Sequence, residues 1–576
     1  MSTATTTFIP EEFDASTWGA LEPYYTDLSE REVTSRDELE RWLLDRSELD
    51  AAAGETRANL YIRMTCHTDD EGAAGAWSAY LDEVPPKLKP ATFALDRKQA
   101  ELLKAYTEPG DRLDLLAKRT INSVELFRDE NVPIETKLAK LDQEYDKVCG
   151  EQLVEWDGER LPIARMTVFL QDPDRAVRER AWRAVASRRL EDKQKIEDIF
   201  DEMIKLRDQA AKNAGFANFR DYQHKKMERF DYTPDDCLRF HDAVERHVVP
   251  FKRELDERRR ANLGVDTLRP WDLACDERGR PALRPFEDGQ ELVEKTRTVF
   301  ERLDPALAEL FASLGDNMGP GKTGPTDLDL DSRKGKASGG YQYERPRSRA
   351  PFIFMNASGV HRDVETMVHE AGHAFHSMLC AYRPLNADRD YPIEFAEVAS
   401  MTMELLTLPH WDVYYPDSAD ADRARRQQLE GSVTTLTWLV TIDAFQHWLY
   451  LNPTHTRAER AAHWRSLHER FGGSESWEGL DDELSYMWQR QGHLFGVPFY
   501  YIEYAIAQLG ALGIWVNSLN EGVDAALSSY KQALDLGGSR PLPDLFEAAG
   551  VKLDFSAERV KTLIDAVRAE TAKLPD

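Results

Sequence analysis

The sequence predicts a mainly α-helical protein with one small β-sheet. Long charged segments rich in leucine and alanine fill most of the chain from Ser35 onward, and apolar residues recur in them at three- and four-residue spacing. Only two short runs, 340–343 and 351–356, have the character of strands. No fixed-period repeat is present, which argues against a regular solenoid.

Composition narrows the class of protein. The chain has 576 residues, of which 41% are hydrophobic and 10% aromatic, and its net charge is −29. An acidic field of this size repels nucleic acids and acidic membrane surfaces, so we expect neither as a partner. The five cysteines are widely spaced and form no CxxC pair, which is typical of free thiols in a reducing compartment.

Neither the first residues nor the apolar stretches have the pattern of a targeting or membrane-spanning segment. The first seven residues contain no basic region followed by an apolar run. No apolar stretch reaches the roughly 18 residues that a membrane-spanning helix needs. We therefore expect a cytoplasmic protein without a membrane partner, and the sequence indicates no oligomeric state.

The first 340 residues predict a series of helices, and a long loop follows the last of them. Ser35 and Glu38 form a capping-box pattern that opens an early helix. Asp172 as the N-cap and Pro173 as the first helical residue predict another helix start. The glycine- and proline-rich segment 315–340 predicts a long surface loop.

The two strand runs follow that loop and precede the next helix. We expect them to form a small sheet next to it. The outer strand could hold an extended peptide by main-chain pairing, a recurrent way of binding peptides. The alternative is a ribbon with a structural role only.

A proline-free segment, 363–379, predicts a helix that carries two histidines on one face. His369 and His373 are four residues apart, so both imidazoles can reach one metal ion. Gly372 costs roughly 1 kcal/mol against alanine inside a helix, which suggests that another backbone or a ligand passes close by. The alternative is an amphipathic helix with two surface histidines.

A third ligand and a base are also available. Zinc in a catalytic site takes three protein ligands and keeps one position open for water. Glu397, 24 residues past His373 on a predicted helix 394–408, is the candidate third ligand. Glu370 can reach the water as a general base. Glu404 on the same predicted helix either orients a ligating histidine or is a solvated surface residue.

Two other residues near the metal helix are candidates for packing. His376 shares the histidine face but lies a further turn along, so we expect packing or an outer-sphere role. Cys380 lies seven residues past His373, and we expect a buried thiol there, not a ligand.

The region 488–515 is dense in polar aromatic residues. His493, Tyr501 and Tyr504 lie in it, and the two tyrosines share a face of a predicted helix after Pro498. Phenol and imidazole groups on that face could donate hydrogen bonds to an oxyanion. The alternative is an aromatic helix packed in the core.

Several of these motifs together resemble one family. The sequence is similar to the thimet-type zinc oligopeptidases, and in particular to their oligoendopeptidase F branch. The motifs that carry the resemblance are 268–272, 339–341, 352–356, 363–366, the HEAGH core at 369–373, His376, 395–397, and His493 with 498–501 and Tyr504.

The resemblance implies a two-lobed helical metallopeptidase with a deep channel and a small sheet beside the HExxH helix. It implies one zinc ion per chain on His369, His373 and Glu397. It also implies an N-terminal helical lobe over 1–170, a catalytic region over 171–576, and short peptides as substrates.

The function expected from these residues is hydrolysis of internal bonds of short peptides. A zinc-bound water attacks the peptide carbonyl, Glu370 acts as general base, and His493, Tyr501 and Tyr504 hold the oxyanion. One alternative is a zinc carboxypeptidase on a related helical fold, which would need an arginine as substrate carboxylate anchor. The other is a non-catalytic helical peptide-binding protein.

Overall fold

Helices make up most of the computed structural model, which describes residues 8–315 and 327–575. The expectation of a mainly α-helical chain is therefore confirmed. The helices up to the first break in the described residues are α1 (Trp18–Glu30), α2 (Arg36–Cys66), α3 (Glu71–Glu83), α4 (Pro85–Tyr106), α5 (Asp114–Leu126), α6 (Val132–Gly150), α7 (Thr167–Leu170), α8 (Arg175–Glu191), α9 (Lys193–Asn213), α10 (Phe219–Lys226), α11 (Pro234–His247), α12 (Val249–Leu263), α13 (Gly289–Leu303) and α14 (Pro305–Gly315).

The second half contains the remaining helices. They are α15 (His361–Leu379), α16 (Asn386–Arg389), α17 (Ile393–Leu406), α18 (Ser418–Leu451), α19 (Arg457–Phe471), α20 (Asp481–Ser485), α21 (His493–Gly496), α22 (Tyr501–Glu521), α23 (Val523–Asp535), α24 (Leu542–Ala548) and α25 (Ala557–Thr571). Short 3-10 turns lie at Asp129–Asn131, Ile163–Met166, Pro270–Asp272, Leu408–Val413 and Met487–Arg490.

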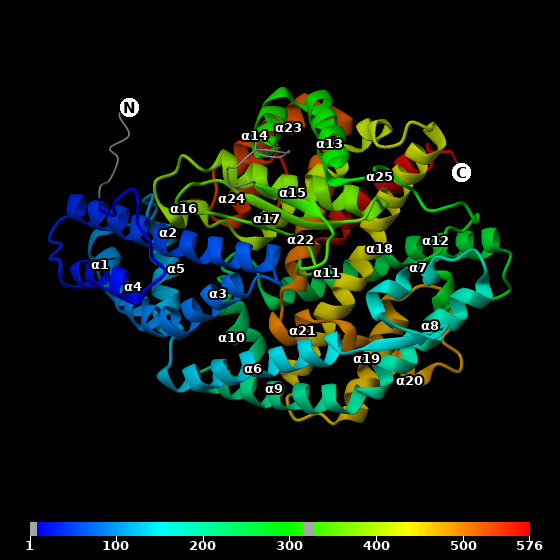
Figure 1. The fold of residues 1–576 in the computed structure, drawn as a ribbon, viewed down its shortest axis with the longest axis horizontal. Coiled ribbons are helices and arrows are strands. Elements are labelled where there is room, and N and C mark those ends of the chain that lie inside the picture. The colour runs from blue at the N-terminus through cyan, green and yellow to red at the C-terminus, as the bar shows by residue number, and fades with distance from the viewer. Residues whose placement is uncertain (1–7, 316–326, 576) are drawn as a thin grey trace.

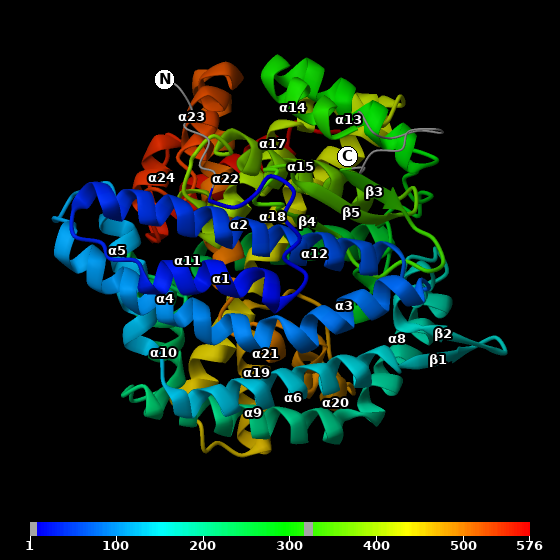
Figure 2. The same ribbon diagram turned by 60° about the vertical axis from the view of Figure 1, so that its left-hand side comes forward.

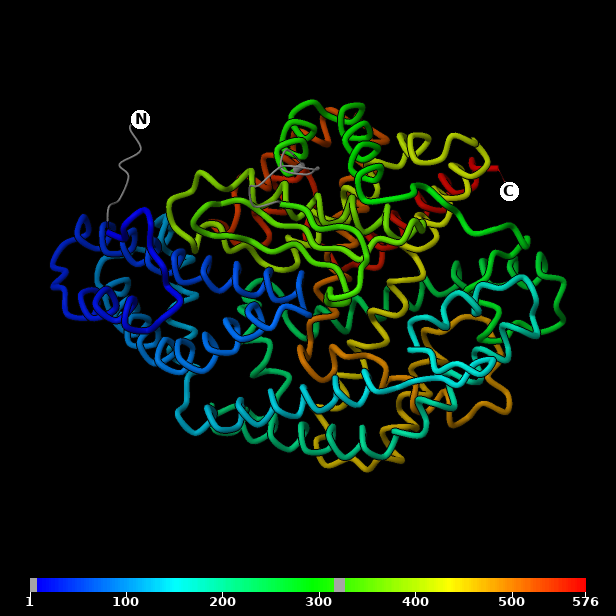
Figure 3. Tube along the Cα trace, viewed as in Figure 1, coloured from blue at the N-terminus to red at the C-terminus, as the bar shows by residue number. Residues whose placement is uncertain are grey.

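The helices form two lobes. In Figure 1, α13 to α17 and α23 to α25 lie in the upper lobe, and α6, α9, α19 and α20 lie in the lower one. The long helices α18 and α22 run between the lobes and pack against each other. The tube in Figure 3 follows the same path and shows the N-terminal helices at one end of the molecule.

The N-terminal helices bury a hydrophobic cluster of their own. It contains buried residues between Ile9 and Ala117, joined by Leu385, and includes the fully buried Trp42, whose indole Nε1 donates to Leu28 O at 2.9 Å. The Ser35 hydroxyl accepts from Glu38 N at 3.3 Å, which caps α2 as the sequence predicts. A much larger cluster begins at Leu126 and includes buried residues of α15, α17, α18 and α22, and two small clusters lie around Trp156 and Phe354.

A hairpin in the helical region was missed by the sequence reading. Strands β1 (Leu153–Trp156) and β2 (Glu159–Pro162) pair antiparallel, and Figure 2 shows them at the margin of the molecule. Asp157 and Gly158 form the turn with φ of 49° and 89°. An Asp-Gly pair is the usual signal for such a turn, so the signal was present in the sequence.

The predicted start of α8 was also wrong by two residues. The helix begins at Arg175, and Asp174 caps it by accepting from Ala176 N at 2.9 Å. The Arg178 guanidinium donates hydrogen bonds to Asp172 O and Pro173 O, each at 2.9 Å. These two residues therefore lie before the helix and not in its first turn.

The small sheet lies beside α15, as predicted. It has the order β3 (Leu328–Asp331), β5 (Phe352–Ala357) and β4 (Tyr341–Tyr343), with β3 parallel and β4 antiparallel to the central β5. Strand β3 contradicts the loop predicted over 315–340. Leu328 and Leu330 alternate inward, a period-two pattern that the glycines around it concealed. Residues 316–326 of that segment lie outside the described residues.

No helix in the described ranges is both long and apolar enough to cross a membrane.

Candidate active site

Helices α15 and α17 approach each other closely at Gly372. A Cβ at this glycine would lie 2.6 Å from both Ala399 O and Ser400 Cα. Only a residue without a side chain allows the two backbones to come so near. The glycine predicted to mark a close approach therefore lies where the two helices meet.

The start of α15 is held by Asp363. Its Oδ2 accepts from the backbone N–H groups of Ser358 at 2.8 Å and Val360 at 3.0 Å. These contacts satisfy donors that a helix N-terminus otherwise leaves free, and they fix the rotation of the helix. The face turned toward α17 then carries His369 and His373.

The contact between α15 and α17 brings three possible ligands together. Glu397 Oε2 lies 3.4 Å from His369 Nε2 and 3.7 Å from His373 Nε2. The two imidazole rings are 4.9 Å apart between centroids, with planes at 86°. All three donor atoms lie within 4.8 Å of one another.

This donor set fits a tetrahedral zinc ion. With metal–ligand distances of about 2.0–2.1 Å, neighbouring ligands in a tetrahedron are roughly 3.3 Å apart, close to the separations observed. Two imidazoles and one carboxylate leave a fourth position open. The side chains of His369 and His373 remain 23% and 15% exposed, so the fourth position can be reached from solvent.

Further residues orient the three possible ligands. Glu404 Oε1 lies 2.6 Å from His369 Nδ1, and the backbone O of Ala396 accepts a hydrogen bond from His373. The Ser400 hydroxyl donates to Glu397 Oε2 at 3.1 Å. Contacts of this kind set the ring orientation and leave each Nε2 free to bind a metal.

The charges around the histidines differ between the two rings. Burial acts to lower the pKa of His369, but its bonds to Glu397 and Glu404 outweigh burial and raise that pKa well above its ordinary value. Burial lowers the pKa of His373 to about 4. Burial acts to raise the pKa of Glu397, yet the two histidines and Ser400 lower it overall. A cation can replace the proton held between these groups.

Glu370 lies beside the ligands and is buried. Burial, with Glu397 nearby, raises the pKa of its carboxyl to about 7, although His369 opposes the change. The backbone N–H of Gln342 on the edge strand β4 donates to this carboxyl. A group with a pKa near 7 can both take and return a proton at neutral pH.

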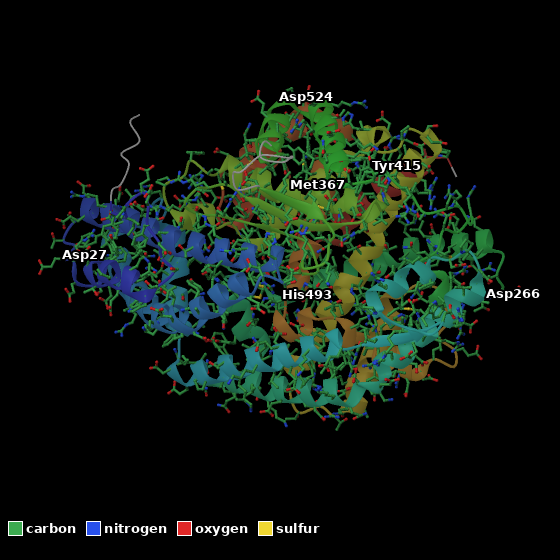
Figure 4. All side chains as sticks on the ribbon, viewed as in Figure 1. Asp27, Asp266, Met367, Tyr415, His493 and Asp524 are labelled. Atoms are coloured by element: carbon green, nitrogen blue, oxygen red, sulfur yellow. The ribbon has the colours of Figure 1, made fainter. Side chains whose placement is uncertain are left out.

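The aromatic residues predicted as donors form one cluster. The His493 ring lies 4.8 Å from Tyr501 and 6.2 Å from Tyr504, between centroids. Figure 4 shows His493 near the centre of the molecule, below Met367 of α15. Burial raises the pKa of both phenols, which therefore stay protonated and able to donate.

Tyr500 belongs to this cluster; it lies in the predicted region of polar aromatic residues but was not among the predicted donors. Its hydroxyl is hydrogen-bonded to Tyr504, and the two rings are 5.1 Å apart. Burial raises the pKa values of Tyr500 and Tyr504, and the negative charge of Glu397 adds to both increases. The Tyr501 hydroxyl oxygen instead accepts hydrogen bonds from Trp438 and Gln491, which act to lower the pKa of its phenol. Tyr500 and Tyr504 are therefore the tyrosines that face the ligands electrostatically.

The contacts of Gln491 assign the tautomer of His493. Trp438 Nε1 can only donate, and it lies 3.3 Å from Gln491 Oε1. The amide nitrogen of Gln491 therefore faces His493 Nδ1, at 3.0 Å, and donates to it. His493 Nε2 then carries the ring proton, and burial keeps the ring neutral by lowering its pKa.

His376 and Cys380 lie apart from the three possible ligands. The His376 ring is fully buried and stacks on Tyr391 at 3.4 Å between centroids. Cys380 is buried, with its Sγ 3.6 Å from Ser377 O. Both residues pack in the interior, the arrangement expected for Cys380 and one of the two expected for His376.

A second buried group of possible ligands lies elsewhere in the core. His224, Cys237 and His447 have donor atoms within 4.8 Å of one another. The Arg229 guanidinium lies 3.2 Å from His224 Nε2, and this positive charge opposes a cation there. Asp443 is 3.3 Å from His447 and 2.8 Å from His241. We read this group as a polar network of the core.

The chain matches one protein family over most of its length. A family model described as peptidase family M3 matches residues 168–563. The structure superposes on PZ peptidase A with inhibitor 2 with a TM-score of 0.86 and 27% sequence identity, covering 98% of this chain and 99% of that one.

Two relatives that are similar in sequence are oligopeptidases by name. Group B oligopeptidase PepB of Streptococcus agalactiae serotype III (strain NEM316) is 21% identical over 67% of this chain. An oligoendopeptidase F homolog of Lactococcus lactis subsp. lactis (strain IL1403) is 23% identical over 54% of it. The matches span 61% and 50% of these two relatives.

Proposed function

The chain belongs to peptidase family M3, and on that premise we propose that it is a zinc-dependent endopeptidase acting on short peptides. This is the oligoendopeptidase F type of activity expected from the sequence. The observation that carries the proposal is the convergence of His369, His373 and Glu397 on one point, with the Glu370 carboxyl beside them.

The three converging side chains would hold one zinc ion. His369 and His373 would bind through Nε2, and Glu397 through Oε2. When bound, zinc supplies a Lewis acid that polarises the peptide carbonyl and makes a water molecule more acidic. Glu404 and Ala396 O orient the two rings for this task.

Glu370 is the proposed general base. Its carboxyl accepts a proton from the attacking water and later returns that proton to the leaving amine. Its pKa of about 7, raised by burial, suits both transfers at neutral pH. The hydrogen bond from the Gln342 backbone fixes the carboxyl in place.

The aromatic cluster is proposed to hold the oxyanion. His493 can donate from Nε2, and the phenols of Tyr500 and Tyr504 remain protonated because burial raises their pKa values. Donors aimed in advance at a developing negative charge stabilise the transition state. Tyr501 accepts hydrogen bonds from Trp438 and Gln491, which hold its ring beside His493, and its own O–H remains able to donate.

The substrate is proposed to lie along the edge strand β4. The sheet order leaves one side of Tyr341–Tyr343 unpaired within the described residues. An extended peptide can add to such an edge through its main chain, without a fixed sequence. The bond from Gln342 to Glu370 places this edge next to the base. The region 1–170 is proposed as an N-terminal lobe that walls the channel, with 171–576 as the catalytic region.

The test is hydrolysis of an internally quenched peptide of about ten residues, offered as the free acid and as the C-terminal amide. An endopeptidase releases internal fragments, which mass spectrometry identifies, and a chelator abolishes the reaction until zinc is restored. Glu370→Gln should keep zinc and lose roughly 10²- to 10⁴-fold in rate. Glu365→Gln, on the same helix, serves as the matched control.

Other outcomes would favour the alternatives. Release of single residues from the free acid alone would indicate a zinc carboxypeptidase. Bound zinc and bound peptide without cleavage of either form would indicate a non-catalytic peptide-binding protein. Full activity in Glu370→Gln would contradict the assignment of the base.

A further inference from the structure

A cavity of about 500 Å³ lies between helices α6 and α8 and the segment around η5 (Met487–Arg490). This volume is within the range of roughly 300–1,000 Å³ that small-molecule and cofactor sites occupy. Its walls are mostly apolar and aromatic, with Trp182, Trp477, Tyr486 and Met487 among them. None of the proposed catalytic residues lines it.

Two arginines and one carboxylate, Glu483, line this cavity, and among the described residues neither arginine is paired with that carboxylate. Arg189 comes from α8 and Arg490 from the end of η5. Across residues 8–315 and 327–575, neither guanidinium forms an ion pair, and Arg189 Nε has no hydrogen-bond partner. The neighbouring Arg188, by contrast, bonds Asp192 at 2.6 Å.

The two guanidinium groups differ in their exposure: Arg189 is half-buried, and Arg490 is exposed to solvent. Desolvation by the surrounding residues, together with the positive charge of Arg189, lowers the pKa of Arg490 to about 10, although its side chain keeps contact with solvent. Burial also lowers the pKa of Arg189. The chain has 103 acidic residues against 74 basic ones, so a carboxylate partner was readily available in composition. Two like charges left together in a cavity indicate that their partner comes from solution.

The cavity adjoins the candidate active site through the segment that follows η5. The Arg490 guanidinium lies 4.9 Å from the Trp438 ring, whose Nε1 donates to Gln491. Gln491 in turn holds His493. On the cavity side, Tyr145 donates to Gln489 O at 2.8 Å. One short stretch of chain therefore presents an arginine to the cavity and a histidine to the proposed catalytic cluster.

We propose that Arg189 and Arg490 bind a carboxylate group of the peptide substrate, either its C-terminus or an acidic side chain. This inference rests on the proposed peptidase function, because the ligand is the substrate of that site. The planar guanidinium matches a carboxylate in geometry and binds it through two parallel hydrogen bonds. The aromatic walls would take the side chains next to that group.

The sequence alone offered no means of choosing a carboxylate anchor among many arginines. In the structure, most arginines near α8 are engaged: Arg175 and Arg178 both bond Asp272, and Arg180 bonds Asp157. The absence of a partner singles out Arg189 on this helix. Its position next to Arg490 makes the pair a candidate anchor that lies beyond the catalytic cluster.

Binding can be tested without turnover in the zinc-loaded Glu370→Gln protein. Three fluorescein-labelled peptides of about ten residues would be compared by anisotropy: a free acid without acidic residues, its C-terminal amide, and the amide with one glutamate near its end. The free acid should bind roughly 10- to 100-fold more tightly than its amide, the range of a charge-assisted hydrogen bond. Tight binding by the glutamate-containing amide would identify an acidic side chain as the group bound.

Arg490→Gln and Arg189→Gln, each added to Glu370→Gln, should reduce this preference to about one. Arg183→Gln removes an exposed arginine of α8 that pairs with Glu179, and it should leave the preference unchanged. A preference that persists in both test variants, or equal binding of all three peptides at the start, would overturn the inference.

Stability provides a second readout. Because Arg189 and Arg490 repel each other, Arg490→Gln should keep or raise the unfolding midpoint. A lower midpoint together with weaker binding would show a structural role and would also overturn the inference. Selective binding through Arg490 without any cleavage by the wild-type protein would leave this site standing and refute the proposed peptidase.

Discussion

Gly372→Ala is expected to weaken zinc binding by forcing α15 and α17 apart. The new Cβ would lie 2.6 Å from Ala399 O and from Ser400 Cα, both of them backbone atoms that cannot rotate away. Reaching the ordinary contact distance of 3.4 Å requires the helices to separate by about 0.8 Å. Glu397 lies on α17, so its distance from both histidines changes with that movement.

The size of the effect follows from two opposing terms. Overpacking a rigid contact costs typically about 1–3 kcal/mol, and alanine regains up to about 1 kcal/mol of helix propensity over glycine. With the full regain of helix propensity, the net loss in the free energy of unfolding is then about 0–2 kcal/mol. Metal sites tolerate only about 0.2 Å in ligand distance. Zinc affinity should therefore fall by at least about tenfold, which is the smaller of the losses usual when a residue that orients a metal ligand is mutated.

Two measurements separate these effects. Competition with a chelator of known affinity gives the zinc dissociation constant, and urea unfolding in the presence of excess chelator gives the stability of the metal-free chain. Gly431→Ala is the matched control, because Gly431 lies inside α18 and its Cβ would meet nothing within 4 Å. That substitution should stabilise the chain by about 0.5–1 kcal/mol without changing zinc affinity. Wild-type zinc affinity in Gly372→Ala would refute the reasoning.

Three further predictions follow from single side chains. Glu404→Ala removes the acceptor at His369 Nδ1 and should lower zinc affinity by about 10- to 100-fold, measured by the same competition. Tyr500→Phe removes a hydroxyl whose pKa responds to the charge of Glu397, and it should lower kcat by about 10²-fold, more than Tyr501→Phe does. Equal losses of kcat in the two variants would contradict the assignment of donors. Burial lowers the pKa of His224 to about 2, so the folded chain stays neutral there while the unfolded chain gains a proton below about pH 6.5. Stability should therefore fall by about 2 kcal/mol between pH 6.5 and 5 in urea unfolding, and His224→Gln should flatten this decline.

The two histidines proposed as metal ligands were within reach of sequence reasoning because their pattern is local. His369 and His373 share a helix face by spacing alone, and the cost of Gly372 signalled that another chain segment lies close. The structure identifies that segment as α17 and brings Glu397 to the two rings. The sequence left open whether Glu404 orients a histidine or lies solvated on the surface. In the structure, Glu404 Oε1 lies 2.6 Å from His369 Nδ1.

The arginine pair could not be found in this way. Any arginine has the same local signal, and what distinguishes Arg189 and Arg490 is that they line one cavity together and, among the described residues, form no ion pair. The hairpin at 153–162 was different, because the Asp157-Gly158 pair is a sequence signal for a two-residue hairpin turn and could have predicted it. Strand β3 was hidden by composition, since four residues of alternating leucine and aspartate lie in a glycine-rich stretch.

Tyr500 was missed because the entry to α22 depends on a distant arginine. The spacing of Tyr501 and Tyr504 predicts one shared face, but Phe499, just before Tyr500, has a φ of 68°. Such a conformation costs a bulky residue about 1–3 kcal/mol and persists only where its surroundings impose it.

The groups that impose it come from other helices. Gln446 Oε1 accepts from Phe499 N at 2.5 Å, and the buried Arg229 donates both to Phe499 O and to Glu503 at 2.9 Å. Arg229 thereby joins the segment after α10 to the first turn of α22. The backbone turns at Phe499, and the phenol of Tyr500 is directed to the side of Tyr504 and Glu397. The buried polar network around Arg229 thus has a use: it holds a strained turn that aims the proposed oxyanion donors.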